Sequence, residues 1–276
     1  MRTCSTLLVS ATCLLLFSCQ KEIDFADANG GGGGTPDARL QRLVSRSGSD
    51  SSTLEFGYNS SGKLITLNTT DVTSGTTSVT RERVERNSQG IIQKLIIKDD
   101  AYQQAGLDSV VTTIEYNAGK YISKVTVIDL GVVVFRDSVA LLYDAGGKVV
   151  TERIYDDLGT GSYEEDGKIE YTYTGNNVAT VKQYSYDGST YSLVVTYSYD
   201  EYDNKISPMN IGLEAFVFDS PAMYSSNNPT KSSIADSGTS QSFTTTYTYN
   251  TSNKPLTGTS TFQPGNTTAT ASYYYQ

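Results

Sequence analysis

The feature that most restricts the fold of this chain is a sequence pattern that recurs from residue 54 onward. Each copy holds an apolar-x-aromatic stretch, a polar turn that contains Gly or Asn, and then a second apolar stretch, which Lys often precedes. The first five steps between copies are 26 to 30 residues long, and the last is 50 residues. A period of this length indicates one small structural unit repeated along the chain. The aromatic position falls at Tyr58, Tyr116, Tyr143, Tyr173, Tyr199 and Tyr249, with Arg86 in its place in the second copy.

Each copy predicts a β-hairpin. The residues before the aromatic position alternate with period two, as in Ile169–Tyr173, and this is the period of a strand. The Gly, Asn and Asp residues of the turn tolerate the positive φ angles that a tight hairpin needs. Two strands in each of about seven copies give about fourteen antiparallel strands. The sequence therefore predicts an all-β fold, a long antiparallel meander in one curled or twisted sheet, with a barrel or a two-sheet sandwich as the alternative.

The long last step predicts an insertion at residues 203–232. We expect this insertion to form a longer loop or a short helix that lies over one end of the sheet. The one helix that the sequence predicts is short and lies near Ile211–Phe218.

The N-terminus has the pattern of an export signal. Met1 and Arg2 precede the apolar run Leu7–Phe17, which is too short for a membrane span. The stretch from Leu16 to Cys19 resembles a bacterial lipobox, although Phe17 departs from the small residue usual at that position. The sequence predicts a lipoprotein signal peptide over residues 1–18 and a lipid on Cys19, and the alternative is an ordinary secretory signal.

The segment that follows is rich in Gly, with an unbroken run from Gly30 to Gly34. Such a segment does not pack and is typical of a flexible tether. We therefore divide the chain into the signal peptide, a lipidated Cys19 with its tether at residues 19–36, and a β domain at residues 37–276. Removal of residues 1–18 would leave Cys19 as the single cysteine, since Cys4 and Cys13 lie in the signal.

The turn that runs from Tyr143-Asp144 to Gly147-Lys148 resembles the YD repeat of Rhs-type proteins, in which a Tyr-Asp turn marks each hairpin of a long sheet. Together with the lipobox and the segment Tyr202–Pro208, it also resembles uncharacterised Bacteroidetes envelope lipoproteins with YD-like hairpin repeats. The resemblance implies a fold and a place in the envelope. It implies no activity, because that family has no established one.

Composition excludes several classes of function. The chain has no His and no Trp, so His-based catalysis and His-ligated zinc are impossible. A net charge of −9 argues against nucleic acid as a partner. The acidic stretches lack the ligand spacing of a calcium loop, and no glycine loop is placed to hold a phosphate. We expect no catalytic residue, no metal and no cofactor, and we regard a glycan-active enzyme as the least favoured function.

The 21 tyrosines are the main candidates for structure and for binding. Pairs at i and i+2 place two rings on one face of a strand, and we expect them on the inner face of the sheet, where a large ring replaces missing Leu and Phe. The opposite face is rich in Thr, Ser, Lys and Glu, which favours a sheet in water over an outer-membrane barrel. These pairs are Tyr171/Tyr173, Tyr184/Tyr186, Tyr197/Tyr199 and Tyr247/Tyr249.

Tyrosines outside the paired positions are expected to be exposed and are the candidate binding residues. The sequence predicts a non-catalytic, extracytoplasmic lipoprotein on the outer membrane that binds a glycan or a cell-surface protein. The alternative is a periplasm-facing envelope scaffold that contacts proteins through sheet edges or the 203–232 insertion. The candidate binding residues are Tyr155, Tyr163, Tyr191, Tyr202 and Tyr224.

Overall fold

The computed structural model describes residues 39–276 except 105, 130–133, 158 and 237. The predicted signal peptide, Cys19 and tether lie outside the described residues. Within them, no helix is long and apolar enough to cross a membrane.

The strands are β1 (Leu40–Ser47), β2 (Asp50–Tyr58), β3 (Leu64–Thr73), β4 (Thr76–Arg86), β5 (Ile92–Asp99), β6 (Val110–Asn117), β7 (Lys120–Asp129), β8 (Val134–Tyr143), β9 (Val149–Asp157), β10 (Glu164–Thr174), β11 (Asn177–Tyr186), β12 (Tyr191–Ile206), β13 (Asn227–Asp236), β14 (Ser240–Tyr249), β15 (Pro255–Gln263) and β16 (Thr267–Tyr275). The helical segments are α1 (Asp100–Gln104) and the 3-10 helices η1 (Gly212–Phe216) and η2 (Pro221–Tyr224).

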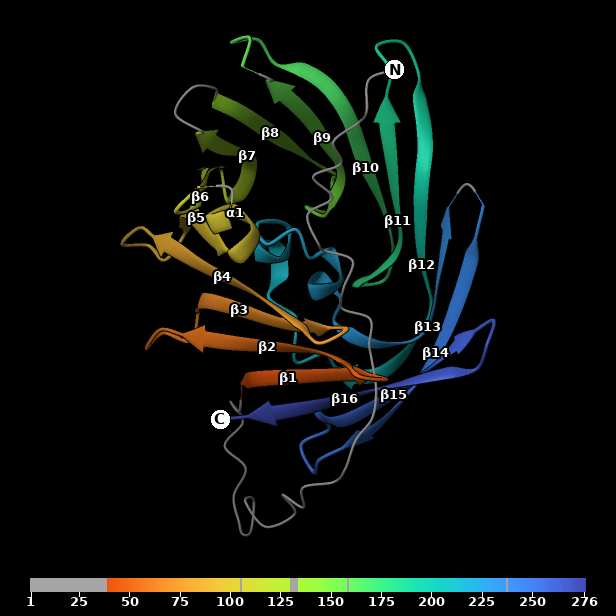
Figure 1. The fold of residues 1–276 in the computed structure, drawn as a ribbon. Helices are drawn as coiled ribbons and strands as arrows, with labels where there is room; N and C mark the ends of the chain where they lie inside the picture. Colours follow the sequence, from red (N-terminus) through yellow and green to blue (C-terminus); the bar gives the residue numbers. More distant parts are fainter. Residues whose placement is uncertain (1–38, 105, 130–133, 158, 237) are drawn as a thin grey trace.

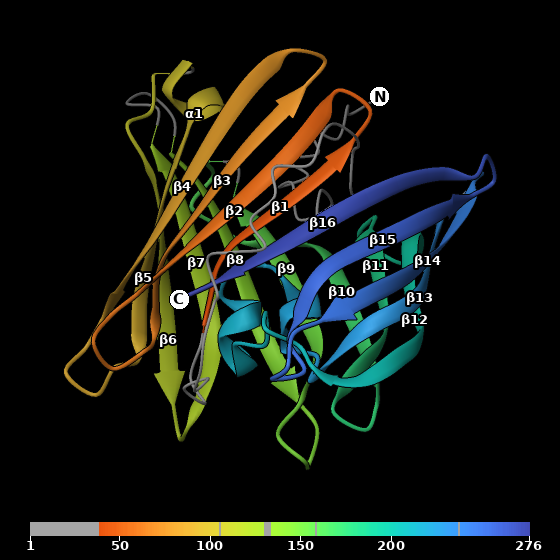
Figure 2. The ribbon, with the colours of Figure 1, turned by 90° about the horizontal axis from the view of Figure 1, so that it is seen from below.

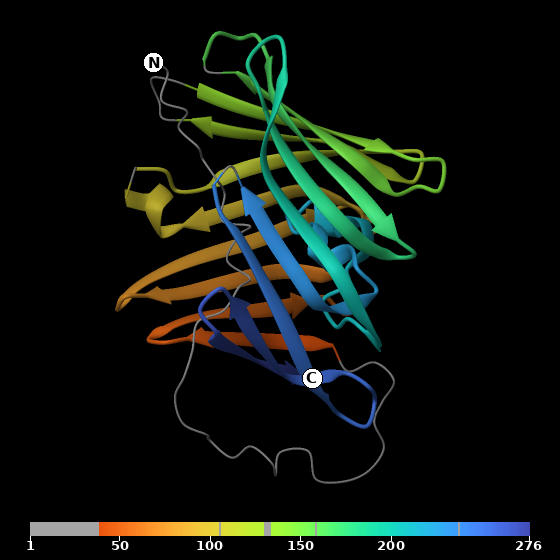
Figure 3. The ribbon, with the colours of Figure 1, turned by 90° about the vertical axis from the view of Figure 1, so that its right-hand side faces the viewer.

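These sixteen strands form a closed barrel in which every strand pairs antiparallel with its neighbours in the chain (Figure 1). Closure comes from β1, where Leu43 pairs with Leu54 of β2 on one side and with Tyr273 of β16 on the other. The strands are inclined as they wrap around the interior (Figure 3). The predicted all-β antiparallel meander is confirmed. The single sheet is confirmed too, but it has the closed form that the sequence predicts only as the barrel alternative, because the last strand returns to the first and removes both free edges.

The hairpins have the turns that the repeat predicts. In the first copy the side chain of Asn59 accepts hydrogen bonds from the backbone N–H groups of Ser61 and Lys63, at 3.0 and 2.9 Å. Gly62 closes this turn with a φ of 76°, which side-chain-bearing residues rarely adopt. The same bond to the residue four positions on is made by Asn87, Asp144 and Asn250.

In most copies a side chain at or near the aromatic position bonds to the backbone of the preceding strand and so ties the hairpin to it. The hydroxyl of Tyr143, at the end of β8, donates to the backbone carbonyl of Tyr121 in β7, at 2.6 Å. In the second copy the guanidinium of Arg86 makes the corresponding bond to the carbonyl of Leu64, at 2.6 Å. Further ties join Tyr58 to Leu40, Tyr173 to Val149, Tyr202 to Val178, Tyr247 to Pro229 and Tyr275 to Pro255.

Three of these ties correct the repeat as read from the sequence. In the seventh copy Tyr247 makes the tie, and the predicted Tyr249 bonds to Asp203 instead. In the sixth copy Tyr202 makes the tie, and Tyr199 does not hold the predicted position, since irregularities in β12 shift its pairing with β13 after Tyr199. Tyr275 belongs to an eighth copy, so the chain has sixteen strands instead of about fourteen.

A barrel of sixteen strands is too wide for the side chains of its wall to meet at the centre. Residues 207–226 fill this barrel at the end where the tyrosine ties lie (Figures 1 and 2). Phe216 and Val217 are fully buried, and Met223 is 1% exposed. We call residues 207–226 the plug. A short helix near Ile211–Phe218 is present as η1, and it lies inside the barrel.

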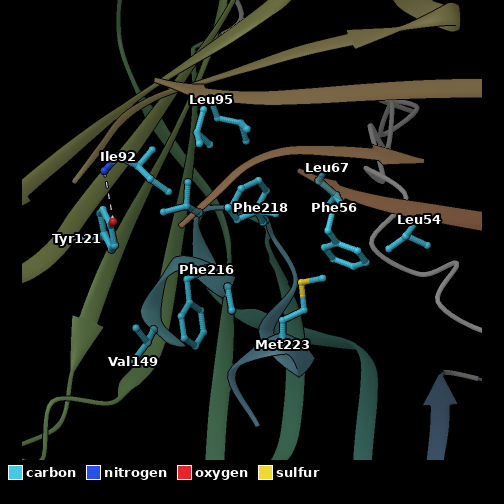
Figure 4. Packing of buried hydrophobic residues seen from close by; sticks show 14 of the residues in the cluster. Leu54, Phe56, Leu67, Ile92, Leu95, Tyr121, Val149, Phe216, Phe218 and Met223 are labelled. Atoms are coloured by element: carbon cyan, nitrogen blue, oxygen red, sulfur yellow. Dashed lines mark hydrogen bonds between the residues drawn. The ribbon is translucent and has the colours of Figure 1, made fainter. Parts of the chain in front are cut away.

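The plug packs against apolar side chains from many strands of the wall. Phe216 meets the ring of Tyr171 edge-on, with 5.2 Å between ring centroids, and the ring of Tyr224 packs against Tyr173. Phe218 and Met223 lie among the leucines and Phe56 of the first strands (Figure 4). The core of this protein is therefore formed between the barrel wall and the plug.

Two ionic contacts anchor the plug to the wall. Arg86 of β4 holds both carboxylate oxygens of Glu214, at 2.6 and 2.7 Å. Lys124 of β7 donates to the carbonyl of Phe216, at 2.8 Å, and to the carboxylate of Asp219. Both wall cations are almost fully buried, so the plug neutralises charges that would otherwise be costly inside the barrel.

Candidate binding surface

The interior beyond the plug is acidic. Register places Asp137 directly opposite Asp156, on the same inner face as the buried Glu152, and Glu82 lies between Leu67 and Ile97 on that face. Burial and the nearby Asp166 and Asp137 raise the pKa of Asp156 to about 6. Asp137, Asp156 and Glu82 keep some contact with solvent, and Glu152 does not. Among the described residues, no group of three or more acidic or cysteine side chains is placed to hold a metal ion.

Glu82 should make the stability of the barrel depend on pH. Burial, and then the charge of Asp219, raise the pKa of Glu82 to about 8 from 4.5. Its stabilising contribution is therefore complete below about pH 4.5 and is lost as the pH rises through about 8. We expect Glu82→Gln to raise the free energy of unfolding by about 1–2 kcal/mol at pH 9, because water contact weakens the effect, and to change little at pH 4.

Urea unfolding of the full chain at the two pH values checks this expectation. Glu55→Gln is the matched control, since Glu55 is exposed on the outer wall. Equal effects of the two substitutions at pH 9 would contradict the claim that ionised Glu82 destabilises the barrel.

The outer wall of the barrel is polar around its circumference. Residues of opposite charge face each other across neighbouring strands, and threonine hydroxyls bond across others, as between Thr172 and Thr180. A lipid-facing wall needs an apolar band, which these charged side chains interrupt. The charged cross-strand pairs are Arg42/Glu55, Glu85/Lys94, Glu170/Lys182 and Glu201/Lys231.

One part of this outer wall carries a group of aromatic rings. Tyr184 and Tyr186 of β11 face Leu193 and Tyr191 of β12. The ring centroids of Tyr186 and Tyr191 are 4.8 Å apart, and those of Tyr184 and Tyr191 are 6.5 Å apart. Lys168 of β10 lies over two of the rings, 4.3 Å from the centroid of Tyr191 and 4.9 Å from that of Tyr184. We call Tyr184, Tyr186 and Tyr191 the outer aromatic cluster.

Charged neighbours hold the cluster in place. The hydroxyl of Tyr191 donates to Glu165, and this bond is the main cause that raises the pKa of Tyr191. Tyr184 is hydrogen-bonded to Glu170, which also accepts from Lys168 at 2.6 Å and has its pKa lowered chiefly by that bond. The rings of Tyr184 and Tyr191 are therefore held by hydrogen bonds, although they lie on the outside of the barrel.

The structure separates the five predicted binding residues into two groups. Tyr191 belongs to the cluster, Tyr155 lies beside it through a hydrogen bond with Arg153, and Tyr163 is 44% exposed just before β10. Tyr202 and Tyr224 lie inside the barrel instead. The first bonds to Val178 and Ser225, and the second packs against Phe216. The expected exposure is therefore wrong for these two. Irregular pairing in β12 turns Tyr202 into the barrel, and Tyr224 belongs to the plug.

The sequence predicts Tyr184 and Tyr186 on the inner face, but they lie on the outer one. The other three tyrosine pairs face inward as predicted. Two of the inward pairs, Tyr171/Tyr173 and Tyr247/Tyr249, end strands that lead into turns of the repeat. The third pair, Tyr197/Tyr199, lies within β12. Tyr184 and Tyr186 end a strand that leads into the opposite set of turns, where the alternation has been shifted by irregular pairing in β10 and β11.

No protein-family model matches the sequence, and a search of curated proteins gives no match. Two solved structures share the fold. A porin-like protein from Bacteroides uniformis ATCC 8492 is 16% identical, with a TM-score of 0.55 over 88% of this chain and 98% of that one. A porin-like protein from Bacteroides vulgatus ATCC 8482 is 14% identical, with a TM-score of 0.53 over 87% of this chain and 99% of that one. The chain thus has the barrel fold of these two proteins.

Proposed function

We propose that the protein is a non-catalytic lipoprotein of the outer membrane whose barrel is a binding module and not a channel. The observation that carries this proposal is the combination of a plugged interior with a polar outer wall. A channel needs an open passage and a lipid-facing band, and the anchored plug and the charged cross-strand pairs oppose both. Attachment would then come from the lipid on Cys19, as the lipobox predicts.

The position of the first strand supports the same arrangement. β1 starts at Leu40, and the backbone carbonyl of Leu40 accepts the hydrogen bond of Tyr58. Since the tyrosine ties lie at the plugged end, β1 begins at that end of the barrel. A tether from Cys19 would hold this end toward the membrane and direct the other end outward. The Bacteroides origin of the two porin-like structures favours an envelope location as well.

The alternative of an envelope scaffold loses the features on which it depended. The sixteen described strands close into a barrel, so no strand edge is left for pairing with a partner. The plug, which is most of the 203–232 insertion, is packed inside the wall. The outer aromatic cluster remains as the binding surface.

Replacing the anchor tests the proposal. We expect the full chain to take up labelled fatty acid and to sediment with membranes, and Cys19→Ser to be found folded in the soluble fraction. A Cys19→Ser protein that stays in the membrane after a salt wash would contradict the proposal. Protease treatment of intact cells then identifies the side, since loss of the barrel means the cell surface and protection means the periplasm.

A further inference from the structure

We propose that the outer aromatic cluster binds neutral polysaccharide. This inference rests on the proposed function, because it assigns a ligand class to the binding module. Its starting point is the placement of three tyrosine rings side by side on a solvent-facing wall, at the end of β11 and the start of β12. Leu193 and Val194, 52% and 41% exposed, extend the apolar surface beside the rings.

The contribution of these rings to folding stability does not explain why they are held in place. Ion pairs and hydrogen bonds on a solvated surface contribute little to stability, and the core of this protein lies on the other side of the wall. Yet Lys168 lies over two rings, and Glu165 and Glu170 fix two hydroxyls. Side chains that are already ordered lose little conformational entropy when a ligand binds, so the arrangement favours recognition.

The chemistry of the cluster matches a sugar. A pyranose ring has a face of C–H groups and a rim of hydroxyls, and a tyrosine has an apolar ring with a polar tip. The charged groups around the rings supply donors from Lys168 and Arg153 and acceptors from Glu165 and Glu170, and sugar hydroxyls need both. Several adjacent rings on an open wall fit a chain of sugars better than one small molecule in a pocket.

The charges around the cluster favour a neutral polysaccharide over an anionic one. The cations beside the cluster all have carboxylate neighbours. Lys168 pairs with Glu170 at 2.6 Å and Arg153 with Glu165 at 3.9 Å. Lys182 lies opposite Glu170 across the strands. The whole chain carries a net charge of −9. A polymer of uronic acids would meet these carboxylates and the negative field of the protein, and it would gain no unpaired cation in the cluster.

The test uses the purified full chain and a set of polysaccharide probes. The neutral probes are granular starch, microcrystalline cellulose and a soluble galactomannan, and the anionic probe is polygalacturonate. We expect at least one neutral probe to retain the protein and polygalacturonate to retain it at least tenfold less. The triple variant Tyr184→Ala/Tyr186→Ala/Tyr191→Ala should lose at least tenfold in affinity.

Two variants keep the test specific. Tyr274→Ala removes a tyrosine elsewhere on the outer wall, one that stacks with Arg42 at 4.3 Å, and should bind as the parent does. Tyr191→Phe keeps the ring without its hydroxyl and should retain most of the affinity even if the triple variant unfolds. Failure of all neutral probes, preference for polygalacturonate, or full binding by a folded triple variant would overturn the inference. Membrane attachment through Cys19 would be unaffected by any of these results, so the proposed anchoring is judged separately.

Discussion

Replacing Lys124 by Met should lower the free energy of unfolding by about 3–5 kcal/mol. Lys124 is fully enclosed between the wall and the plug, and its ammonium lies 3.7 Å from Glu152 and 2.8 Å from the carbonyl of Phe216. Although burial opposes the charge, Asp219 and Glu152 raise the pKa of Lys124, so it stays charged at neutral pH. Without it, the buried Glu152 has only the hydroxyl of Tyr171 as a partner.

Urea unfolding of the full chain measures this loss. Lys98→Met is the matched control, because Lys98 pairs with Asp108 on an exposed part of the outer wall and should cost less than about 1 kcal/mol. The double variant Lys124→Met/Glu152→Gln should recover part of the loss, since it no longer leaves an unpaired buried charge. Similar stabilities for Lys124→Met and Lys98→Met would show that the plug does not depend on this contact.

Arg86→Ala should be the second large loss, also of about 3–5 kcal/mol. The side chain of Arg86 is 6% exposed and does two tasks: it makes the hairpin tie to the carbonyl of Leu64, and it holds the carboxylate of Glu214. Arg86→Tyr separates these tasks, since tyrosine is the residue that makes the tie in most of the other hairpins. We expect Arg86→Tyr to be less damaging than Arg86→Ala, and Arg86→Tyr/Glu214→Gln to be less damaging still.

Hydrogen exchange of residues 212–224 reports on the plug in these variants. Exchange there should become faster in Arg86→Tyr while the strands stay protected, because only the anchor of the plug is lost. If Arg86→Tyr exchanged as slowly as the parent within the plug, Glu214 would not be an anchor. The only role left for Arg86 would then be its hydrogen bond to the carbonyl of Leu64.

The sequence predicts the local structure of this protein much better than its closure. The Asn or Asp turns after Tyr58, Arg86 and Tyr143 predict hairpins because turn chemistry acts within a few residues. Closure depends on β16, in which Tyr275 pairs with Leu40 of β1, and the repeat pattern does not identify Tyr275 as a copy. It also depends on pairing between β1 and β16, which are far apart in sequence.

Irregular pairing explains the remaining differences. One extra residue in a strand moves every later side chain to the other face. Because of such shifts in β12, Tyr202 makes the hydrogen bond that the repeat predicts for Tyr199. Shifts in β10 and β11 likewise turn Tyr184 and Tyr186 outward. The plug could be predicted as a break in the repeat, while its place inside the barrel follows from the width of sixteen strands, a number that the repeat alone underestimates.

The fold and the outer wall lead to different expectations about function. A sixteen-stranded barrel is wide enough for an aqueous channel, as in porins. In this chain the plug fills one end, and charged pairs such as Arg42/Glu55 and Glu170/Lys182 face outward. We therefore propose that the barrel lies in water, is held by an N-terminal lipid, and presents its outer aromatic cluster to ligands.

The most direct test of this claim is the accessibility of the outer wall in native membranes. Single cysteines replace Thr172 of β10 and Thr246 of β14, two outward-facing threonines that lie four strands apart in the wall. A membrane-impermeant maleimide is added after the outer membrane has been made permeable. We predict that both positions react as fast as they do in detergent solution, because both face water. Protection of both positions until detergent is added would place the wall in lipid and contradict the account.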